Sequence, residues 1–127
     1  MTIKEVSEKY DITQDTIRYY EKIGLLPPVP RTKSGIRNFN EQSCKWLEFI
    51  KCMRSSGMPI ESLIKYMNLF KKGKETIIAR KNLLLEQRKI LEEKQKDIKS
   101  TIKRLDYKIH LYDEIEAGIR KDFMEEP

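Results

Sequence analysis

The sequence is poor in the residues that most often carry covalent and metal chemistry. Its 127 residues include only two cysteines, Cys44 and Cys52, and one histidine, His110. The cysteines lie eight positions apart, and with the histidine they form no recognised metal-ligand spacing. Two cysteines also make no disulfide framework. Since a phosphate-cradling glycine loop and an H-E-x-x-H pattern are missing too, we expect no metal, no cofactor and no enzymatic activity.

Long apolar runs are also missing. No segment approaches the roughly 20 apolar residues that span a membrane, and the N-terminus lacks the basic and then apolar pattern of a secretory signal. Charged residues make up 36% of the chain and hydrophobic residues 39%, with a mean hydropathy of -0.66. This balance is typical of a small domain that carries a long, charged helix. We expect a cytoplasmic protein without membrane contact.

Positive charge is concentrated in the first part of the chain. Up to Lys74 there are 14 Lys and Arg against 8 Asp and Glu, whereas positions 75–127 hold 12 of each sign. The whole formal net charge of +6 therefore belongs to the first part. A basic module joined to a neutral, charged extension indicates nucleic-acid binding combined with oligomerisation. The alternative is that the lysines only keep the protein soluble, and charge alone does not decide between the two.

Two short helices are predicted at the N-terminus. Thr2 and Glu5 have capping-box spacing, which predicts a helix over residues 3–9. After a tight break, Thr13 caps a second helix that runs to about Lys22 and ends at Gly24. The expected inner face is apolar: Ile3, Val6, Ile12, Ile17 and Ile23. This is the pattern of a helix-turn-helix, with Thr16, Arg18 and Tyr19 on the outward recognition face.

A proline-rich stretch with cations follows. Three prolines at positions 27, 28 and 30 exclude a helix, and a Ser-Gly turn at positions 34 and 35 is flanked by Arg31, Lys33 and Arg37. We interpret this stretch as a small β-hairpin wing. An irregular loop is the alternative, because the arms are too short for a clear alternating pattern.

Two further helices are predicted by their caps and apolar stripes. Asn40 caps a helix ending near Ser56, and Pro59 takes the first position of a fourth helix that ends at residues 71–73. The stripe of the third helix comprises Trp46, Phe49, Ile50 and Met53. That of the fourth comprises Ile60, Leu63, Ile64, Met67 and Phe70. Such stripes are core-forming faces.

The C-terminal part has a heptad pattern. Neither proline nor glycine interrupts positions 75–117, which predicts a helix of roughly 43 residues and about 65 Å. Apolar side chains recur at every seventh position: Ile77, Leu84, Leu91, Ile98, Leu105, Tyr112 and Ile119. Ile102 and Ile109 occupy the other seam position, which elsewhere is polar. A stripe this thin needs a second chain to bury it, so we predict a homodimeric coiled coil; packing back onto the small domain is the alternative.

Three motifs in order carry a resemblance to a known family. They are T-I-R-Y-Y-E at positions 16–21, G-L-L-P-P at 24–28 and S-G-I-R-N-F at 34–39. The chain resembles the MerR family of winged-helix transcription regulators over nearly its whole length. The resemblance implies a mainly α fold, with a winged helix-turn-helix domain over residues 1–73, a dimerisation helix over 74–119 and a short tail over 120–127.

The family resemblance also implies a mechanism. The final helices of a dimer would form an antiparallel coiled coil and place two winged domains on a palindromic promoter. Family members bind an overlong spacer and distort it so that RNA polymerase can use both promoter elements, which is indirect readout used as a switch. Matching the motifs, Arg18, Tyr19 and Tyr20 would contact DNA from the recognition helix, Arg37 from the wing and Arg54 from the third helix. The alternative for Tyr20 is that it is a half-buried core residue.

The stretch W-L-E-F-I-K-C-M-R-S-S-G at positions 46–57 resembles the aldehyde-responsive, AdhR- and NmlR-like branch. There the cysteine matching Cys52 is the proposed electrophile sensor. Helical geometry puts Cys52 about 105° from the Trp46–Met53 stripe and Cys44 nearly opposite it. We therefore expect Cys52 beside the core and Cys44 facing outward. Cys52 as a plain boundary residue, a non-covalent or oxidative signal, and a coiled-coil adaptor protein with a basic face remain alternatives.

Overall fold

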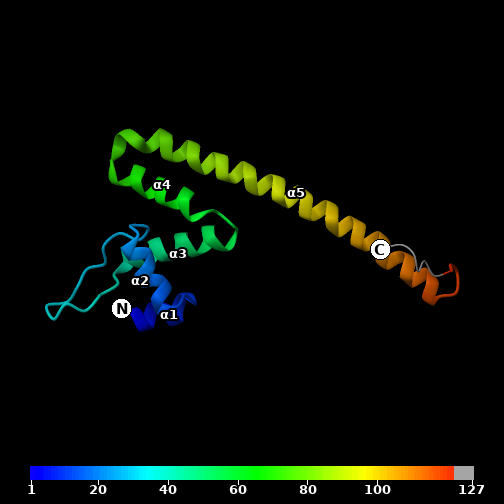
Figure 1. The fold of residues 1–127 in the computed structure, drawn as a ribbon, viewed down its shortest axis with the longest axis horizontal. Helices are drawn as coiled ribbons and strands as arrows, with labels where there is room; N and C mark the ends of the chain where they lie inside the picture. Colours follow the sequence, from blue (N-terminus) through cyan, green and yellow to red (C-terminus); the bar gives the residue numbers. More distant parts are fainter. Residues whose placement is uncertain (122–127) are drawn as a thin grey trace. The chain divides into compact units, whose positions relative to one another are not determined.

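The computed structural model of the chain describes residues 1–121; positions 122–127, most of the predicted tail, lie outside the described residues. The elements run in the order α1 (Ile3–Tyr10), α2 (Gln14–Lys22), α3 (Glu41–Ser55), α4 (Ile60–Lys71), the 3-10 turn η1 (Lys74–Thr76) and α5 (Ile77–Glu116), as Figure 1 shows. The mainly α fold class is confirmed.

The chain divides into two compact units, Met1–Gln87 and Arg88–Pro127. The first unit contains α1 to α4 together with the first turns of α5. The second consists of the rest of α5 and the residues after that helix. The domain boundaries drawn from the family resemblance, at positions 73 and 119, stay a prediction.

The predicted caps form as expected. The Thr2 hydroxyl accepts from the backbone N–H of Glu5, and the Glu5 carboxylate accepts from the N–H of Thr2, both at 3.1 Å. Thr13 accepts from the N–H of Thr16 at 3.2 Å, and Asn40 accepts from the N–H of Ser43 at 2.8 Å. Each bond satisfies one N–H that a helix start leaves unpaired, so these side chains fix where α1, α2 and α3 begin.

Two predicted helix starts need correction. Pro59 is the N-cap of α4 and has extended backbone angles (φ −61°, ψ 146°), so it precedes the helix and is not its first residue. The long helix starts at Ile77, because residues Lys74–Thr76 form a separate 3-10 turn after Gly73. Gly73 has a φ of +96°, a backbone conformation that a side chain would strain.

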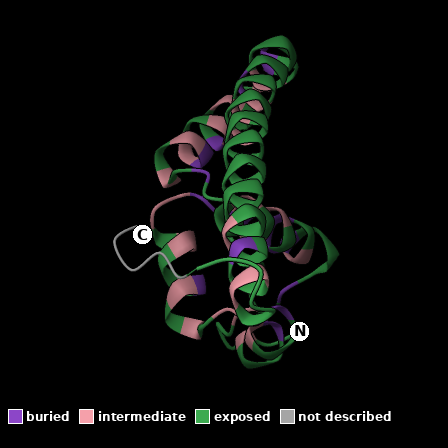
Figure 2. Cartoon of the chain, turned by 90° about the vertical axis from the view of Figure 1, so that its right-hand side faces the viewer, coloured by how far each residue is buried: buried purple, intermediate pink, exposed green. Residues whose placement is uncertain are grey.

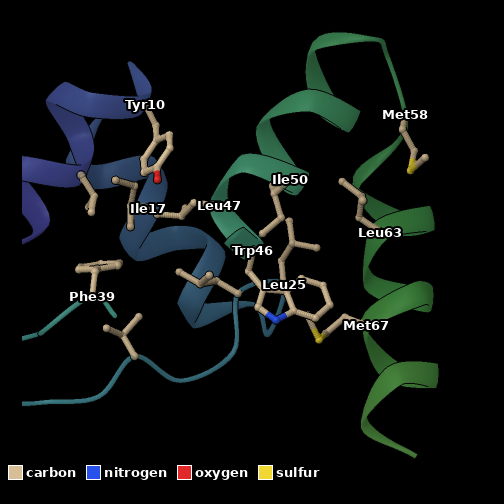
Figure 3. Packing of buried hydrophobic residues seen from close by; sticks show 13 residues of the cluster. Tyr10, Ile17, Leu25, Phe39, Trp46, Leu47, Ile50, Met58, Leu63 and Met67 are labelled. Carbon is tan, nitrogen blue, oxygen red and sulfur yellow. The ribbon is translucent and has the colours of Figure 1, made fainter. Parts of the chain in front are cut away.

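The core of the first unit joins all four short helices and the loop after α2 (Figure 3). Val6 and Ile17 are buried, as the helix-turn-helix pattern predicted, and Leu63 and Met67 are buried on α4. The loop contributes four fully or nearly buried side chains, Leu25, Leu26, Val29 and Phe39. The wing-bearing loop is therefore anchored at both ends in the core.

The stripe predicted for α3 coincides with its buried face only at Trp46 and Ile50. Leu47 (0% exposed) and Ser43 (7%) are buried, whereas Phe49 and Met53 are only partly buried. The true face runs through Ser43, Trp46, Leu47 and Ile50. On α4 the stripe prediction is wrong for Phe70, which is 40% exposed.

Four aromatic side chains gather where α3 meets α4. The Trp46 ring lies 5.0 Å from Phe70 and 6.0 Å from Phe49, both edge to face, and 6.4 Å from Tyr66. They line a shallow hollow of about 220 Å³ together with Gln42 and Lys45. The guanidinium of Arg80 from α5 lies 5.1 Å from the centre of the Phe70 ring.

The connection from α4 to α5 is fastened by one buried threonine. The Thr76 hydroxyl lies 2.6 Å from the carbonyl of Leu69 and 2.7 Å from that of Gly73. Its oxygen also accepts from Nε of Arg80 at 3.1 Å. The end of α4 and the start of α5 are therefore joined by hydrogen bonds as well as by the chain.

Most of α5 carries exposed side chains, which Figure 2 shows in green. Leu84 and Leu91 are half-buried. The remaining predicted dimerisation residues are at least half exposed: Ile77, Ile98, Ile102, Leu105, Ile109 and Tyr112. The apolar stripe thus has no cover within the described chain beyond the first turns of the helix.

Candidate nucleic-acid interface

The helix α2, which the sequence predicted to be the recognition helix, presents polar and aromatic groups on its outer side. Arg18 is exposed, and its guanidinium contacts Asp15 at 3.1 Å and the side-chain oxygen of Gln14 at 3.3 Å. Both partners lie in the first turn of α2, so the cation is directed along the helix surface. Tyr19 is 49% exposed. These are the positions that the helix-turn-helix pattern predicted to face outward.

A hollow of about 410 Å³ brings three of the predicted residues together. Thr16 and Tyr20 of α2 and Arg54 of α3 line it, along with residues of the turn between α1 and α2. Tyr20 is partly buried and packs against the core, which agrees with its alternative role, while its contact with DNA stays a prediction. Nη1 of Arg54 donates to the carbonyl of Met58 at 2.8 Å, which holds the guanidinium at the end of α3.

Lys51 also lines this hollow, although no sequence pattern indicated this cation as part of the interface. Its ammonium donates to the carbonyl of Tyr10, at the C-terminal end of α1. Such a site favours a cation, because the last carbonyls of a helix carry partial negative charge. Lys51 therefore ties α3 to the helix-turn-helix and adds positive charge beside Arg54.

The wing is smaller than the predicted hairpin. Arg31 and Arg37 form a single antiparallel bridge, and the N–H of Thr32 donates to the carbonyl of Ile36 at 2.8 Å. Gly35 makes the turn at a φ of +86°. The described chain contains no β-strand longer than this bridge. Lys33 is exposed on this turn.

One carboxylate, Glu21, connects the recognition helix to the wing. Oε1 of Glu21 accepts from Nε of Arg37 at 2.8 Å, and Oε2 accepts from the backbone N–H of Val29 at 2.8 Å. Nη2 of Arg31 lies 3.9 Å from Oε1. Burial opposes ionisation of Glu21, but the bonds from Val29 and Arg37 and the two arginine charges outweigh it, so the pKa of Glu21 lies below its ordinary value.

Arg37 is consequently not the free wing cation that its place in the motif suggested. Its side chain is only 24% exposed and is bound to Glu21. Arg31 is more exposed, at 48%, and donates to the carbonyl of Gly35 at 2.9 Å. The predicted role of Arg37 in DNA contact stays a prediction, while its contact within the protein is a structural one.

The two cysteines have the opposite placement to the one expected. Cys52 is exposed, whereas Cys44 is half-buried and packs against the core. The expectation was wrong because the buried face of α3 is centred on Ser43, Leu47 and Ile50. Measured from that centre at about 100° per residue, Cys52 lies nearly opposite it and Cys44 on its flank. Burial and a hydrogen bond with Cys44 raise the pKa of Tyr10 to about 12.

From the sequence we expected neither a metal site nor a membrane-spanning segment. Among residues 1–121, no group of three or more His, Cys, Asp or Glu side chains is arranged to hold a metal ion. Within the same described range, every helix is too short or too polar to cross a membrane.

Comparison with known proteins identifies the family. The model of the MerR HTH family regulatory proteins matches residues 1–69, and the MerR DNA-binding model matches residues 44–107. The HTH-type transcriptional regulator AdhR of Bacillus subtilis (strain 168) is 53% identical over 91 residues, which are 72% of this chain and 65% of AdhR. The match thus spans slightly less than two thirds of the length of that relative.

Solved structures agree with this result. A protein from Listeria monocytogenes described as a MerR family transcriptional regulator has 45% identity and a TM-score of 0.86, over 89% of this chain and 86% of that one. HiNmlR, a MerR family regulator that lacks the sensor domain and was solved bound to promoter DNA, has 30% identity and a TM-score of 0.83, over 91% and 92%. The chain therefore belongs to the MerR family of DNA-binding transcription regulators, in its AdhR- and NmlR-like branch.

Proposed function

We propose that this regulator acts as a homodimer, binds a palindromic promoter with an overlong spacer and distorts the DNA so that RNA polymerase can use it. The single observation that carries the proposal is the pairing of a helix-turn-helix, set in the basic first part of the chain, with a 40-residue helix whose apolar stripe is uncovered. One copy binds one half-site, and the paired helices hold two copies at a fixed separation. A fixed separation is what lets a dimer impose a deformation on the DNA between half-sites.

Dimerisation follows from the α5 stripe. Ile98, Ile102, Leu105 and Ile109 are each more than half exposed, although isolated large apolar side chains at coiled-coil spacing gain stability only when they are buried. An antiparallel pair of these helices would cover the stripes of both chains. We therefore infer that the free monomer is not the working form.

DNA contact is assigned to the α2 face, the wing and the hollow beside them. Arg18, Tyr19, Lys33 and Arg31 are exposed there, and the basic first part supplies the excess positive charge. Each phosphate that the dimer neutralises releases counterions and adds about 0.9 to the slope of log affinity against log salt. A steep salt dependence is accordingly expected.

The test of the interface is a pair of single-charge variants. Arg18→Ala removes a cation from the recognition face, and Lys65→Ala removes one from the exposed side of α4. Arg18→Ala should bind the palindrome at least about fivefold more weakly, in line with the loss of a base contact of about 1–3 kcal/mol. Lys65→Ala should bind as the parent does. Equal affinities for the Arg18→Ala variant and the parent would reject the assignment of α2 as recognition helix.

For the signal, we propose reaction of Cys52 with an aldehyde or similar electrophile. Cys52 is exposed, so a small carbonyl compound can reach its sulfur. The thiolate adds to the carbonyl carbon, the π electrons move to the oxygen, and that oxygen takes a proton from water to give a hemithioacetal. Thiolate is the reactive form of cysteine in such additions.

The position of Cys52 favours transmission toward the DNA, and not into the core. It lies in the last turns of α3 between Lys51 and Arg54, the two α3 cations of the hollow. The backbone carbonyl of Cys52 accepts from the Ser56 hydroxyl at 3.2 Å, at the end of the same helix. An adduct here would displace neighbouring cations before it disturbs any buried contact.

In vitro transcription with added aldehyde tests the sensor. Cys52→Ser should keep DNA binding and lose the response to the aldehyde, whereas the matched Cys44→Ser variant should respond as the parent does. An undiminished response from Cys52→Ser would remove the sensor assignment and leave the DNA-binding proposal intact. A response lost in Cys44→Ser alone would move the sensor to the half-buried cysteine.

A further inference from the structure

We propose that Glu21 is a positioning residue for DNA binding, a carboxylate that fixes the wing in its working orientation relative to the recognition helix. This inference rests on the proposed DNA interface and deepens it. Glu21 is an unexpected residue there, because a carboxylate repels phosphate, and the end of a helix is where negative charge is least favoured. The contacts of the Glu21 carboxylate account for an acidic residue at the end of α2.

The contacts of Glu21 join three separate points of the chain. The residue lies in the last turn of α2, and its two oxygens accept from the backbone of Val29 and the guanidinium of Arg37, each at 2.8 Å. Val29 precedes the wing and Arg37 ends it. Arg31, on the opposite arm, lies within 3.9 Å of the same carboxylate. One side chain therefore holds both arms of the wing against α2.

The contacts of Glu21 with the wing are largely shielded from solvent, which strengthens them. The Glu21 side chain is 16% exposed and that of Arg37 is 24% exposed. The Arg18–Asp15 pair on the same helix is 45% and 97% exposed, which is the situation in which ion pairs contribute little. The antiparallel bridge and the bonds from Thr32 to Ile36 and from Asn38 to Pro30 lie within the wing and shape its turn. The bonds to Glu21 run from the wing to α2, so the direction of the wing relative to that helix depends on them.

The sign of the charge effect separates a positioning role from simple electrostatics. If Glu21 acted only through its charge, its removal would make the DNA-facing side more positive and would strengthen binding. If Glu21 orients the wing, its removal weakens binding despite the gain in positive charge. The two effects have opposite signs in one measurement.

The experiment uses the full-length protein and a DNA fragment that carries the protected palindrome. Glu21→Gln keeps the size of the side chain and removes the charge, and Asp15→Asn makes the same change one turn and a half earlier on α2. We expect Glu21→Gln to bind at least about fivefold more weakly and to lose hydroxyl-radical protection over part of each half-site, while the rest of the site stays protected. Asp15→Asn should bind as tightly as the parent or tighter.

Three outcomes decide the proposal. Glu21→Gln binding with parental or higher affinity and a full footprint would overturn it. If Glu21→Gln does not fold, Glu21→Asp decides, because it keeps the charge and shortens the side chain that reaches Val29 and Arg37. Loss of the same protection supports the positioning role, and a parental footprint overturns it. Failure of the proposed DNA interface has a separate sign: the Arg18→Ala variant would then bind the palindrome with parental affinity. The Glu21 variants do not bear on that measurement.

Discussion

The two units of the chain differ in how their apolar side chains are covered. In the first unit the core side chains of α1 to α4 are buried within one chain, for example Leu47 at 0% and Ile17 at 1%. In the second unit Ile98 and Leu105 are 61% and 56% exposed. The first unit has the buried core that an independently folding domain needs, whereas the second has the character of half an interface. Helix propensity alone stabilises such a helix little.

The largest effect should come from breaking the stripe of α5. The double variant Leu91→Asp and Leu105→Asp places two carboxylates in the predicted seam and should abolish the dimer. Sedimentation should then give a monomer, and circular dichroism should show a loss of helix comparable with the distal part of α5. Ser100→Asp, on the outer side of the same helix, is the control and should stay dimeric. A parent protein that sediments as a well-folded monomer at micromolar concentration would show that the stripe of α5 needs no partner chain.

A smaller effect is expected from single truncations in each unit. Ile50→Ala, in the core of the first unit, should lower the free energy of unfolding by about 2–5 kcal/mol. Ile98→Ala should instead weaken association. Urea unfolding at two protein concentrations distinguishes them, because only the Ile98→Ala deficit should grow on dilution. A concentration-dependent deficit for Ile50→Ala would show that the first unit also depends on the partner chain.

A pair of threonine variants tests the hydrogen bonds that join α4 to α5 in the first unit against a similar bond in the second. Thr76→Val removes the hydroxyl that joins α4 to α5 and leaves Nε of Arg80 without its acceptor, although Nη2 of Arg80 still donates to the carbonyl of Gly73. We expect a loss of about 1–3 kcal/mol. Thr101→Val removes a hydroxyl that lies 3.1 Å from the carbonyl of Asp97 on the exposed distal helix and should have almost no effect. Hydrogen exchange at the start of α5 should increase only in Thr76→Val. Equal exchange in both variants would mean that the joint is held by the chain alone.

The smallest expected effect concerns pH in the second unit. Arg120 donates to Glu114 at 2.7 Å, and this bond, followed by the charges of Arg120 and His110, lowers the pKa of Glu114 from 4.5. A depressed folded-state pKa contributes stability that is present above the ordinary value and is lost as the pH falls through the lowered one. Arg120→Ala should therefore raise the pKa of Glu114 in an NMR titration and reduce stability only above that range. An unchanged titration would contradict the contact.

Much of the fold could be predicted from local signals. Thr2, Thr13 and Asn40 each stand before an apolar stripe, and a cap acts within three residues, so the helix starts followed from neighbouring positions. The face of α3 could not be predicted in this way. Its stripe had two overlapping choices, and Leu47 and Ser43 are buried by elements distant in sequence. The reversed placement of Cys44 and Cys52 is the consequence.

Most cations of the candidate interface were named from the sequence, with Lys51 missed, but the contacts that hold them were not predicted. Arg18 and Lys33 are exposed where the motif suggested, while Arg37 is committed to Glu21. The partners of Glu21 lie eight and sixteen positions away, so spacing alone did not reveal them. One signal was available: Glu21 is an acid in the last turn of a helix within a basic segment, and a charge of that sign at that place needs a compensating partner.

The aromatic group between α3 and α4 has a spectroscopic consequence. Trp46 is the only tryptophan of the chain, it is 9% exposed, and three other rings and an arginine–phenylalanine contact surround it. Its fluorescence therefore reports the packing of α3 on α4 and contains no direct signal from the distal part of α5. Fluorescence excited at a wavelength selective for tryptophan can follow unfolding of the first unit, while dissociation of the proposed helix pair is followed separately by anisotropy of an attached dye.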